Sequence, residues 1–395
     1  SRTELEGTST FTFGTSAANH NIGMLQSMAG YGYSEALAFD SIGRLATRTI
    51  TTDQTYQFDY SYNSIGQLDT LTYPASPIPS GQTGSRFKVK YDYSYGEVNQ
   101  ISDVTSGTAA VLWTLNAAND YSQATQETFN SSPTVTTVTS GYKAWTAELT
   151  SVQAGVGSTS NRQNLAFQWD NAGNLTQRQD LNQSLTENFV PDTLNRLSST
   201  SGASSLSITY DAAGDISSRS DVGTYSYPSP SSAHPHGVTA AGSNSFSYDA
   251  NGNVSVRNGL TQTWASFNLP TVLQATISGS TFSSAFTYGP EHQRWKQDAV
   301  YANGTEQTYY VGGLLEKQIP STTGITAWRH YIQTPSGLTI IVSRNSNLTT
   351  STTFVLSDHL GSSEALLNKS GALLVRESFG AFGDRRGSNW AGNPT

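Results

Sequence analysis

The cluster Arg329-His330-Tyr331 combines residue types that some enzymes use together. Polysaccharide lyases take a proton with a Tyr or His base and neutralise the uronate of their substrate with an Arg or Lys. In a β-strand, however, alternate side chains point to opposite faces, so Arg329 and Tyr331 would share one face and His330 the other. A strand with one charged and one aromatic face is the favoured interpretation, and a lyase-like site is the alternative.

Asp358 and His359 are a second pair whose types would suit acid/base chemistry. Neighbouring side chains in a regular strand point apart, so the two would not touch each other there. Gly361 follows three residues after Asp358, which predicts a turn that Asp358 caps and Gly361 closes. We therefore interpret Asp358, His359 and Gly361 as a structural motif.

Other acidic residues belong to a repeated pattern: an aromatic residue, Asp or Asn, two residues, Gly, a polar residue and an aliphatic one. The copies that define it are Phe39–Leu45, Tyr62–Leu68, Trp169–Leu175, Tyr210–Ile216 and Tyr248–Val254. The carboxylates in this pattern could hold a metal or act in catalysis. Turn capping is favoured, because Asn replaces Asp in one copy and both side chains bond backbone amides two residues on.

Each copy has a local physical explanation. The aromatic residue suits the end of a strand, and the Gly supplies the positive φ that a tight turn needs. The residues to which we assign this structural role are Tyr62, Gly66, Trp169, Asp170, Gly173, Tyr210, Asp211, Gly214, Tyr248, Asp249 and Gly252. The interval is near 20 residues, which holds two strands and two turns but not a βαβ unit of about 30 or more. The sequence predicts an all-β array of hairpins, and its one weak helical pattern spans 114–128.

Composition excludes several classes of function. Charged residues make up 13% and the formal net charge is −8, so the clustered Lys and Arg that nucleic-acid binding requires are missing. The sequence has no Cys, which excludes disulfides, zinc–thiolate sites and a Cys nucleophile. It has no phosphate-binding loop or dinucleotide fingerprint, so we expect no cofactor and no metal. No apolar run approaches the roughly 20 residues of a membrane span.

The repeated turns resemble those of the YD or RHS repeat family. The segment Phe354–Ser363 is similar to the "DHLGS" segment of the RHS-associated core. Gly371–Glu377 is similar to the hairpin that follows that segment. Phe379-Gly380-Ala381-Phe382-Gly383 stands where the family usually has Tyr-x-Pro-Phe-Gly. The resemblance extends from the first repeats to the end of the chain.

This resemblance implies a β-spiral of hairpins that forms a hollow shell, here a partial one. In bacterial RHS toxins the shell encloses a variable C-terminal polypeptide, which a self-cleaving aspartyl-protease-like site releases. The carboxylates of that site follow the equivalent of Phe382-Gly383 and are expected beyond Thr395, so we assign no catalytic residue and expect a non-enzymatic chain. We divide it into a YD-repeat spiral, 1–350, and the start of the RHS-associated core, 351–395, and interpret it as a piece of a longer protein.

Three hypotheses about function follow. The first is a shell fragment that sequesters a downstream C-terminal polypeptide, with that polypeptide and the remaining shell as partners. The second is a cell-surface adhesion module that binds glycans or proteins through its outer aromatic residues. The third is a polysaccharide-degrading enzyme on the same scaffold, which would use Arg329, His330 and Tyr331. Each hypothesis expects a bacterial protein that is secreted or held at the cell surface.

Overall fold

The computed structural model describes residues 1–81, 86–130, 135–157 and 159–391 and builds them from β-strands and turns. These ranges contain no helix, and hence none that could span a membrane. The predicted weak helix is wrong, because its residues form β10 (Ala110–Ala118) and β11 (Ala124–Asn130). Trp113 and Phe129 lie opposite each other in this hairpin and are fully buried, so the pairing of two aromatic side chains decides the local structure.

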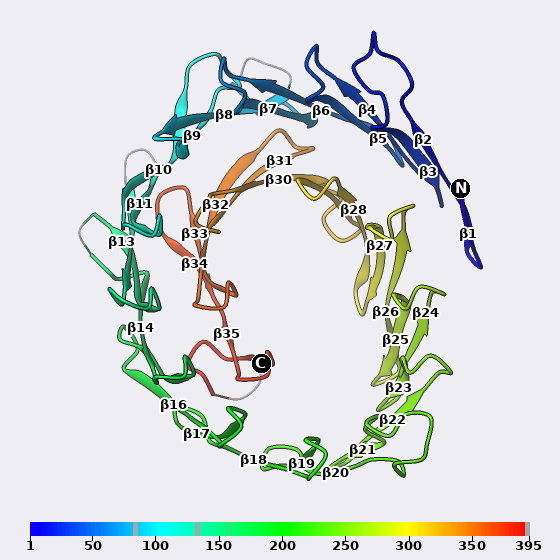
Figure 1. Cartoon of the computed structure of the whole chain (residues 1–395), viewed down its shortest axis with the longest axis vertical. Helices are drawn as coiled ribbons and strands as arrows, with labels where there is room; N and C mark the ends of the chain where they lie inside the picture. Colours follow the sequence, from blue (N-terminus) through cyan, green and yellow to red (C-terminus); the bar gives the residue numbers. More distant parts are fainter. Residues whose placement is uncertain (82–85, 131–134, 158, 392–395) are drawn as a thin grey trace.

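The protein consists of one open antiparallel sheet of 34 strands and a short separate hairpin. Within the sheet, each strand pairs with the strand that follows it in the chain. Strands twist in a constant direction, and a sheet this wide must curl. Figure 1 shows the result, a spiral whose last strands run inside its first ones. The fold is therefore all-β, as the repeats predict, and it forms the spiral that the resemblance implies.

The first part of the spiral is an outer layer, β1–β19. Its strands are β1 (Arg2–Glu4), β2 (Gly7–Phe13), β3 (Leu25–Gly30), β4 (Tyr33–Phe39), β5 (Leu45–Thr51), β6 (Thr55–Tyr62), β7 (Leu68–Ala75), β8 (Arg86–Ser94), β9 (Glu97–Asp103), β10, β11, β12 (Val135–Tyr142), β13 (Leu149–Val156), β14 (Gln163–Trp169), β15 (Leu175–Asp180), β16 (Leu185–Pro191), β17 (Leu197–Gly202), β18 (Leu206–Tyr210) and β19 (Ile216–Arg219).

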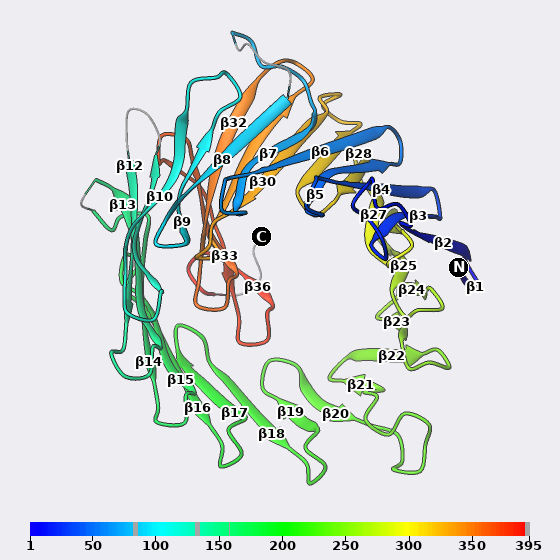
Figure 2. The same ribbon diagram turned by 45° about the horizontal axis from the view of Figure 1, so that its top comes forward.

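The middle of the chain forms an arc that no second layer covers in the described part of the protein (Figures 1 and 2). Its strands are β20 (Gly223–Ser226), β21 (Ala240–Ala241), β22 (Asn244–Tyr248), β23 (Val254–Arg257), β24 (Leu260–Trp264) and β25 (Pro270–Ile277). Of the hydrophobic residues of this arc, only Ala241 and Ala265 are buried. A single layer of sheet has no opposing side chains, so it cannot build a core of its own.

The last part of the chain forms an inner layer, β26–β36. Its strands are β26 (Ser280–Tyr288), β27 (Arg294–Tyr301), β28 (Gly304–Val311), β29 (Leu315–Pro320), β30 (Ala327–Gln333), β31 (Thr339–Asn345), β32 (Thr350–Ser357), β33 (Ser363–Asn368), β34 (Leu373–Arg376), β35 (Ser378–Phe379) and β36 (Arg385–Arg386). From β28 onward these strands lie on the inner side of the outer layer (Figure 1).

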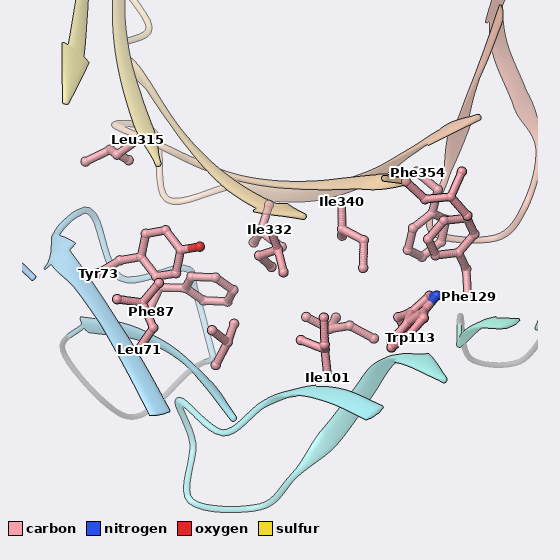
Figure 3. Packing of buried hydrophobic residues seen from close by; sticks show 14 of the residues in the cluster. Leu71, Tyr73, Phe87, Ile101, Trp113, Phe129, Leu315, Ile332, Ile340 and Phe354 are labelled. Carbon is pink, nitrogen blue, oxygen red and sulfur yellow. The ribbon is translucent and has the colours of Figure 1, made fainter. Parts of the chain in front are cut away.

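The hydrophobic core lies between the two layers, in a contact zone that we call the seam. Figure 3 shows Tyr73, Phe87 and Trp113 from the outer layer facing Ile332 and Ile340 from the inner layer. All five side chains are essentially inaccessible to solvent. Residues more than 200 positions apart thus supply the two halves of one core, and burial of both sheet faces stabilises the overlap of the spiral.

Candidate functional site

The repeated turns close through their Asp residue and their Gly. Oδ1 of Asp170 accepts hydrogen bonds from the backbone amides of Ala172 and Asn174, both at 2.9 Å, and Gly173 has a φ of +82°. The side-chain amide of Asn174 donates to Oδ2 at 2.9 Å. The hydrogen bonds from the Asn174 side chain and backbone lower the pKa of Asp170. Its carboxylate is therefore engaged within its own turn.

The other turns singled out from the sequence have the same geometry. Oδ1 of each Asp or Asn accepts two backbone hydrogen bonds of 2.9–3.1 Å. Each Gly has a φ between +81° and +93°. The pairs are Asn63 with Gly66, Asp211 with Gly214, Asp249 with Gly252, and Asp358 with Gly361. Because the hairpins alternate between the two edges of the sheet, these turns all gather on one edge.

The aromatic residues of the repeats form a ladder of hydrogen bonds that the sequence did not reveal. The hydroxyl of Tyr62 donates to the backbone carbonyl of Leu45, the residue that begins the return strand of the preceding repeat, at 2.8 Å. Equivalent bonds of 2.7–2.8 Å run from the hydroxyls of Tyr210 and Tyr288 to the carbonyls of Leu197 and Pro270. The indole N–H groups of Trp169 and Trp264 donate in the same way to the carbonyls of Leu149 and Val254, at 2.7 Å. A β-bulge interrupts the backbone pairing beside these aromatic residues, and the side-chain bond ties neighbouring turns together there.

Arginine strengthens two steps of this ladder. The guanidinium of Arg44 lies 4.3 Å from the ring centre of Tyr62, and that of Arg196 lies 4.1 Å from the ring of Tyr210. Each Arg also pairs with the Asp of its own turn, at 2.7 Å. The signal in the sequence is an Arg directly before the aliphatic residue of a repeat, which places a cation over the aromatic residue of the next one.

Two histidines from the inner layer insert into the seam. The fully buried ring of His330 packs against Tyr73 and Phe87, and burial lowers its pKa to about 3. The ring of His359 packs against Phe167 at 4.7 Å and against Trp169, and burial lowers its pKa to about 4. Both histidines are therefore neutral at neutral pH and act as packing groups there.

A cluster of buried charges closes the seam at the far end of the inner layer. Glu187, on the outer layer, accepts hydrogen bonds from Arg178 at 2.6 Å and from both terminal nitrogens of Arg386 at 2.9 and 3.0 Å. Ser204 also donates to it. Burial opposes ionisation of Glu187, yet the bonds from Arg386 and Ser204 and the charge of Arg178 lower its pKa to about 2. The carboxylate thus clamps β36 against β16.

A second buried cluster lies beside the first. Arg376 bonds Asp180 of the outer layer at 2.9 Å and Glu364 of its own inner layer at 3.0 Å, so the first of these bonds joins the two layers. Burial raises the pKa of Glu364 to about 7, although Arg376 opposes the rise. Oδ2 of Asp358 is 3.9 Å from Arg178, so the turn at Asp358–Gly361 joins the seam as well. No local pattern marks these charged residues; their scarcity in a chain with 13% charged residues is the only signal.

The cluster Arg329-His330-Tyr331 is divided between the two faces of β30. His330 points into the seam, and the side chains of Arg329 and Tyr331 both reach Glu316 on the opposite face. The hydroxyl of Tyr331 donates to that carboxylate at 2.7 Å, and burial with this bond raises its pKa. The structure therefore brings Arg329 and Tyr331 together with a carboxylate and keeps His330 apart from them.

No family model and no curated protein matches the chain by sequence. Among solved structures, it is similar to a crystal structure of TcdB2-TccC3-Cdc42, with 14% identity and a TM-score of 0.77. It is also similar to TcdB2-TccC3 without its hypervariable C-terminal region and to the Tc holotoxin pore of Photorhabdus luminescens, each with 13% identity and a TM-score of 0.78.

These matches cover 96% of this chain but only 21–22% of the longer chains. The similarity therefore concerns the whole spiral described above and about a fifth of each toxin chain. The TcdB2-TccC3 toxin is an RHS/YD-repeat protein. The chain therefore shares the β-spiral fold of these structures, as the resemblance of its turns implies.

Proposed function

We propose that this chain is part of the wall of an RHS-type toxin shell, and that the shell sequesters a downstream polypeptide of the same protein. The observation that carries the proposal is the overlap of the two layers. A spiral wall that overlaps itself by a packed core resists opening more than a single sheet does, because separating the layers exposes apolar surface to water. The protein would act by exclusion, keeping proteases and other proteins away from the enclosed polypeptide.

The inner face of the inner layer supports this function. Side chains alternate along β30, so His330 and Ile332 fill the seam, and Arg329 and Tyr331 point to the other face. That face looks toward the centre of the spiral in Figure 1. Tyr331 and Arg329 reach Glu316 there. At β30 this face therefore offers an enclosed chain polar groups and little apolar surface on which to fold or adhere.

The test is protease protection in a longer version of the protein, which continues into the native C-terminus. We expect the downstream polypeptide to stay bound and resistant to added protease. Phe354→Ala removes a ring that stacks on Phe129 in the seam, at 4.5 Å between ring centres, and should expose the polypeptide. Leu194→Ala, at an exposed turn, is the matched control and should leave protection unchanged. Rapid digestion of the polypeptide in the unaltered protein would refute sequestration.

The division of the chain at residue 350, its secretion or cell-surface location and its bacterial origin belong to this proposal. So do its partners, the enclosed polypeptide and the remaining shell. We do not propose a lyase activity, because Arg329 and Tyr331 are engaged by Glu316 on a different face from His330. Glycan-degrading activity abolished by Tyr331→Phe would reverse that judgement.

A further inference from the structure

The two layers of the spiral separate at one place in the seam and leave a cavity between them. Its volume is about 690 Å³, which lies within the range of about 300–1,000 Å³ that is usual for small-molecule sites. We call it the seam cavity. Residues of both layers line it, among them Phe87, Asp103 and Leu112 from the outer layer and Val342, Arg344 and Lys369 from the inner layer.

Contacts between the layers bound the seam cavity on both sides. In strand order, the backbone amide of Ser80 donates to the carbonyl of Leu348 at 3.0 Å before the cavity. Beyond the cavity, the guanidinium of Arg162 donates to the carbonyl of Gly371. A molecule in the cavity would therefore touch both layers at a point where they do not pack on each other.

The floor of the seam cavity is apolar. Phe87 is fully buried, and Leu112 and Val342 are buried beside it. Thr352 lies directly opposite Val342 in the sheet, so its side chain is on the same face and also lines the cavity. Apolar side chains beside a cavity lack packing partners on one side, so this floor favours a ligand with an apolar body.

The charged residues of the lining favour an anion. Arg344 is buried, with its guanidinium 5.5 Å from the ring centre of Phe87, and Lys369 is exposed. Asp103 is the acidic residue of the lining, so cations prevail there in a chain whose net charge is −8. A guanidinium carries five N–H donors, so Arg344 can bind a carboxylate or sulfonate in addition to its contacts within the chain.

We propose that the seam cavity binds an amphipathic organic anion, a small molecule with an apolar body and a carboxylate or sulfonate group. The apolar body packs on Phe87, Leu112 and Val342, and the anionic group binds Arg344 and Lys369. Because the ligand contacts both layers, its binding stabilises their overlap. This site goes beyond the wall function and does not depend on it, since binding requires no enclosed polypeptide.

The test is calorimetric titration of the chain with 4-phenylbutanoate and 4-phenylbutylamine at neutral pH. The two probes share a phenyl ring and ten carbon atoms but carry opposite charges. We expect 4-phenylbutanoate to bind about tenfold more tightly than the amine, or better. At about 100 times its dissociation constant, 4-phenylbutanoate should slow amide exchange in β31 and β32 about 100-fold, when exchange reports separation of the layers.

Three variants locate the binding site. Lys369→Glu, at an exposed position, should weaken binding of 4-phenylbutanoate about tenfold. Lys88→Glu makes the same change in charge on the outer face of β8, since its neighbour Phe87 faces the seam, and should leave binding unchanged. Thr352→Phe fills the cavity with a residue that suits a strand, so it should abolish binding without lowering the melting temperature.

Three results would overturn the proposal. The first is no binding of 4-phenylbutanoate, and the second is equal binding of the anion and the amine, which would indicate apolar adsorption alone. The third is an equal effect of Lys369→Glu and Lys88→Glu, which would place the anion outside the seam cavity.

Discussion

The substitution Glu187→Gln tests whether buried charges hold the inner layer in place. Glu187 is 1% exposed and bonds Arg178 and Arg386, which are 6% exposed each. Gln keeps the shape but removes the negative charge, which takes the counter-ion from the buried Arg386 and leaves the buried Arg178 with only Asp358, at 3.9 Å. Breaking a buried ion pair in this way costs about 3–5 kcal/mol. The lowering of the pKa of Glu187 from 4.5 to about 2 corresponds to a stabilisation of its ionised form by about 3 kcal/mol.

The assay is hydrogen exchange at β35 and β36, because Arg386 anchors this hairpin. A loss of about 3 kcal/mol should accelerate exchange there on the order of 100-fold when exchange reports the opening equilibrium. In the wild type, the stability that ionised Glu187 contributes should be present above pH 4.5 and be lost as the pH falls toward 2, because the pKa of Glu187 is lower in the folded state than in the unfolded state.

The matched control is Glu377→Gln. Glu377, directly before β35, forms an ion pair with Arg385 of β36, whose side chain is 59% exposed. Such surface pairs contribute about 0–1 kcal/mol, so exchange should change less than about fivefold. Unchanged exchange in Glu187→Gln, or an equal effect of both substitutions, would refute the idea that the buried cluster holds the inner layer.

Three further predictions concern the ladder and the seam. Tyr210→Phe removes the hydrogen bond to the carbonyl of Leu197 and should lower the free energy of unfolding by about 1 kcal/mol in urea titration. Tyr121→Phe, at an exposed turn, is the control and should leave that free energy unchanged. Phe354→Ala should cost about 3–5 kcal/mol in the same assay, because it empties the centre of the seam. The depressed pKa of His359 means that its stabilisation is complete above pH 6.5 and falls as the pH drops toward 4. The difference in free energy of unfolding between wild type and His359→Gln should therefore shrink by about 2 kcal/mol between pH 7 and pH 5. The titration of Glu364 changes stability in the opposite sense, but both proteins contain Glu364, so its contribution cancels in this difference. Equal stability of Tyr210→Phe and wild type, or a difference for His359→Gln that is independent of pH, would count against these roles.

The local structure was predictable because its causes are local. The turn at Asp170–Asn174 depends on a carboxylate, two amides and a Gly with positive φ, all within five consecutive residues. The same reasoning covers the turn of Asp358 and Gly361. The interval between repeats was short enough to exclude a crossover helix, so an all-β array of hairpins followed as well, whereas the spiral was implied by the resemblance to the RHS repeat family.

The seam was not predictable, because its two halves are far apart in the sequence. Phe129 and Phe354 stack on each other, yet no pattern in the chain pairs them. Glu187 and Arg386 are 199 positions apart, and each looks like an ordinary surface residue until the spiral brings them together. The weak helical pattern over 114–128 fails for the same reason, since β10 and β11 are specified by their neighbours in the sheet and by the inner layer.

The most direct measurement of this account asks whether the end of the chain lies against the inside of its beginning. The backbone amide of Ser80 donates to the carbonyl of Leu348 at 3.0 Å, across the two layers. The chain has no Cys, so a Ser80→Cys/Leu348→Cys double variant can form only one intramolecular disulfide. The account predicts rapid cross-linking under mild oxidation and none for Ser80→Cys/Leu194→Cys. Failure of the first pair to cross-link, or cross-linking of both pairs, would contradict the two-layered spiral.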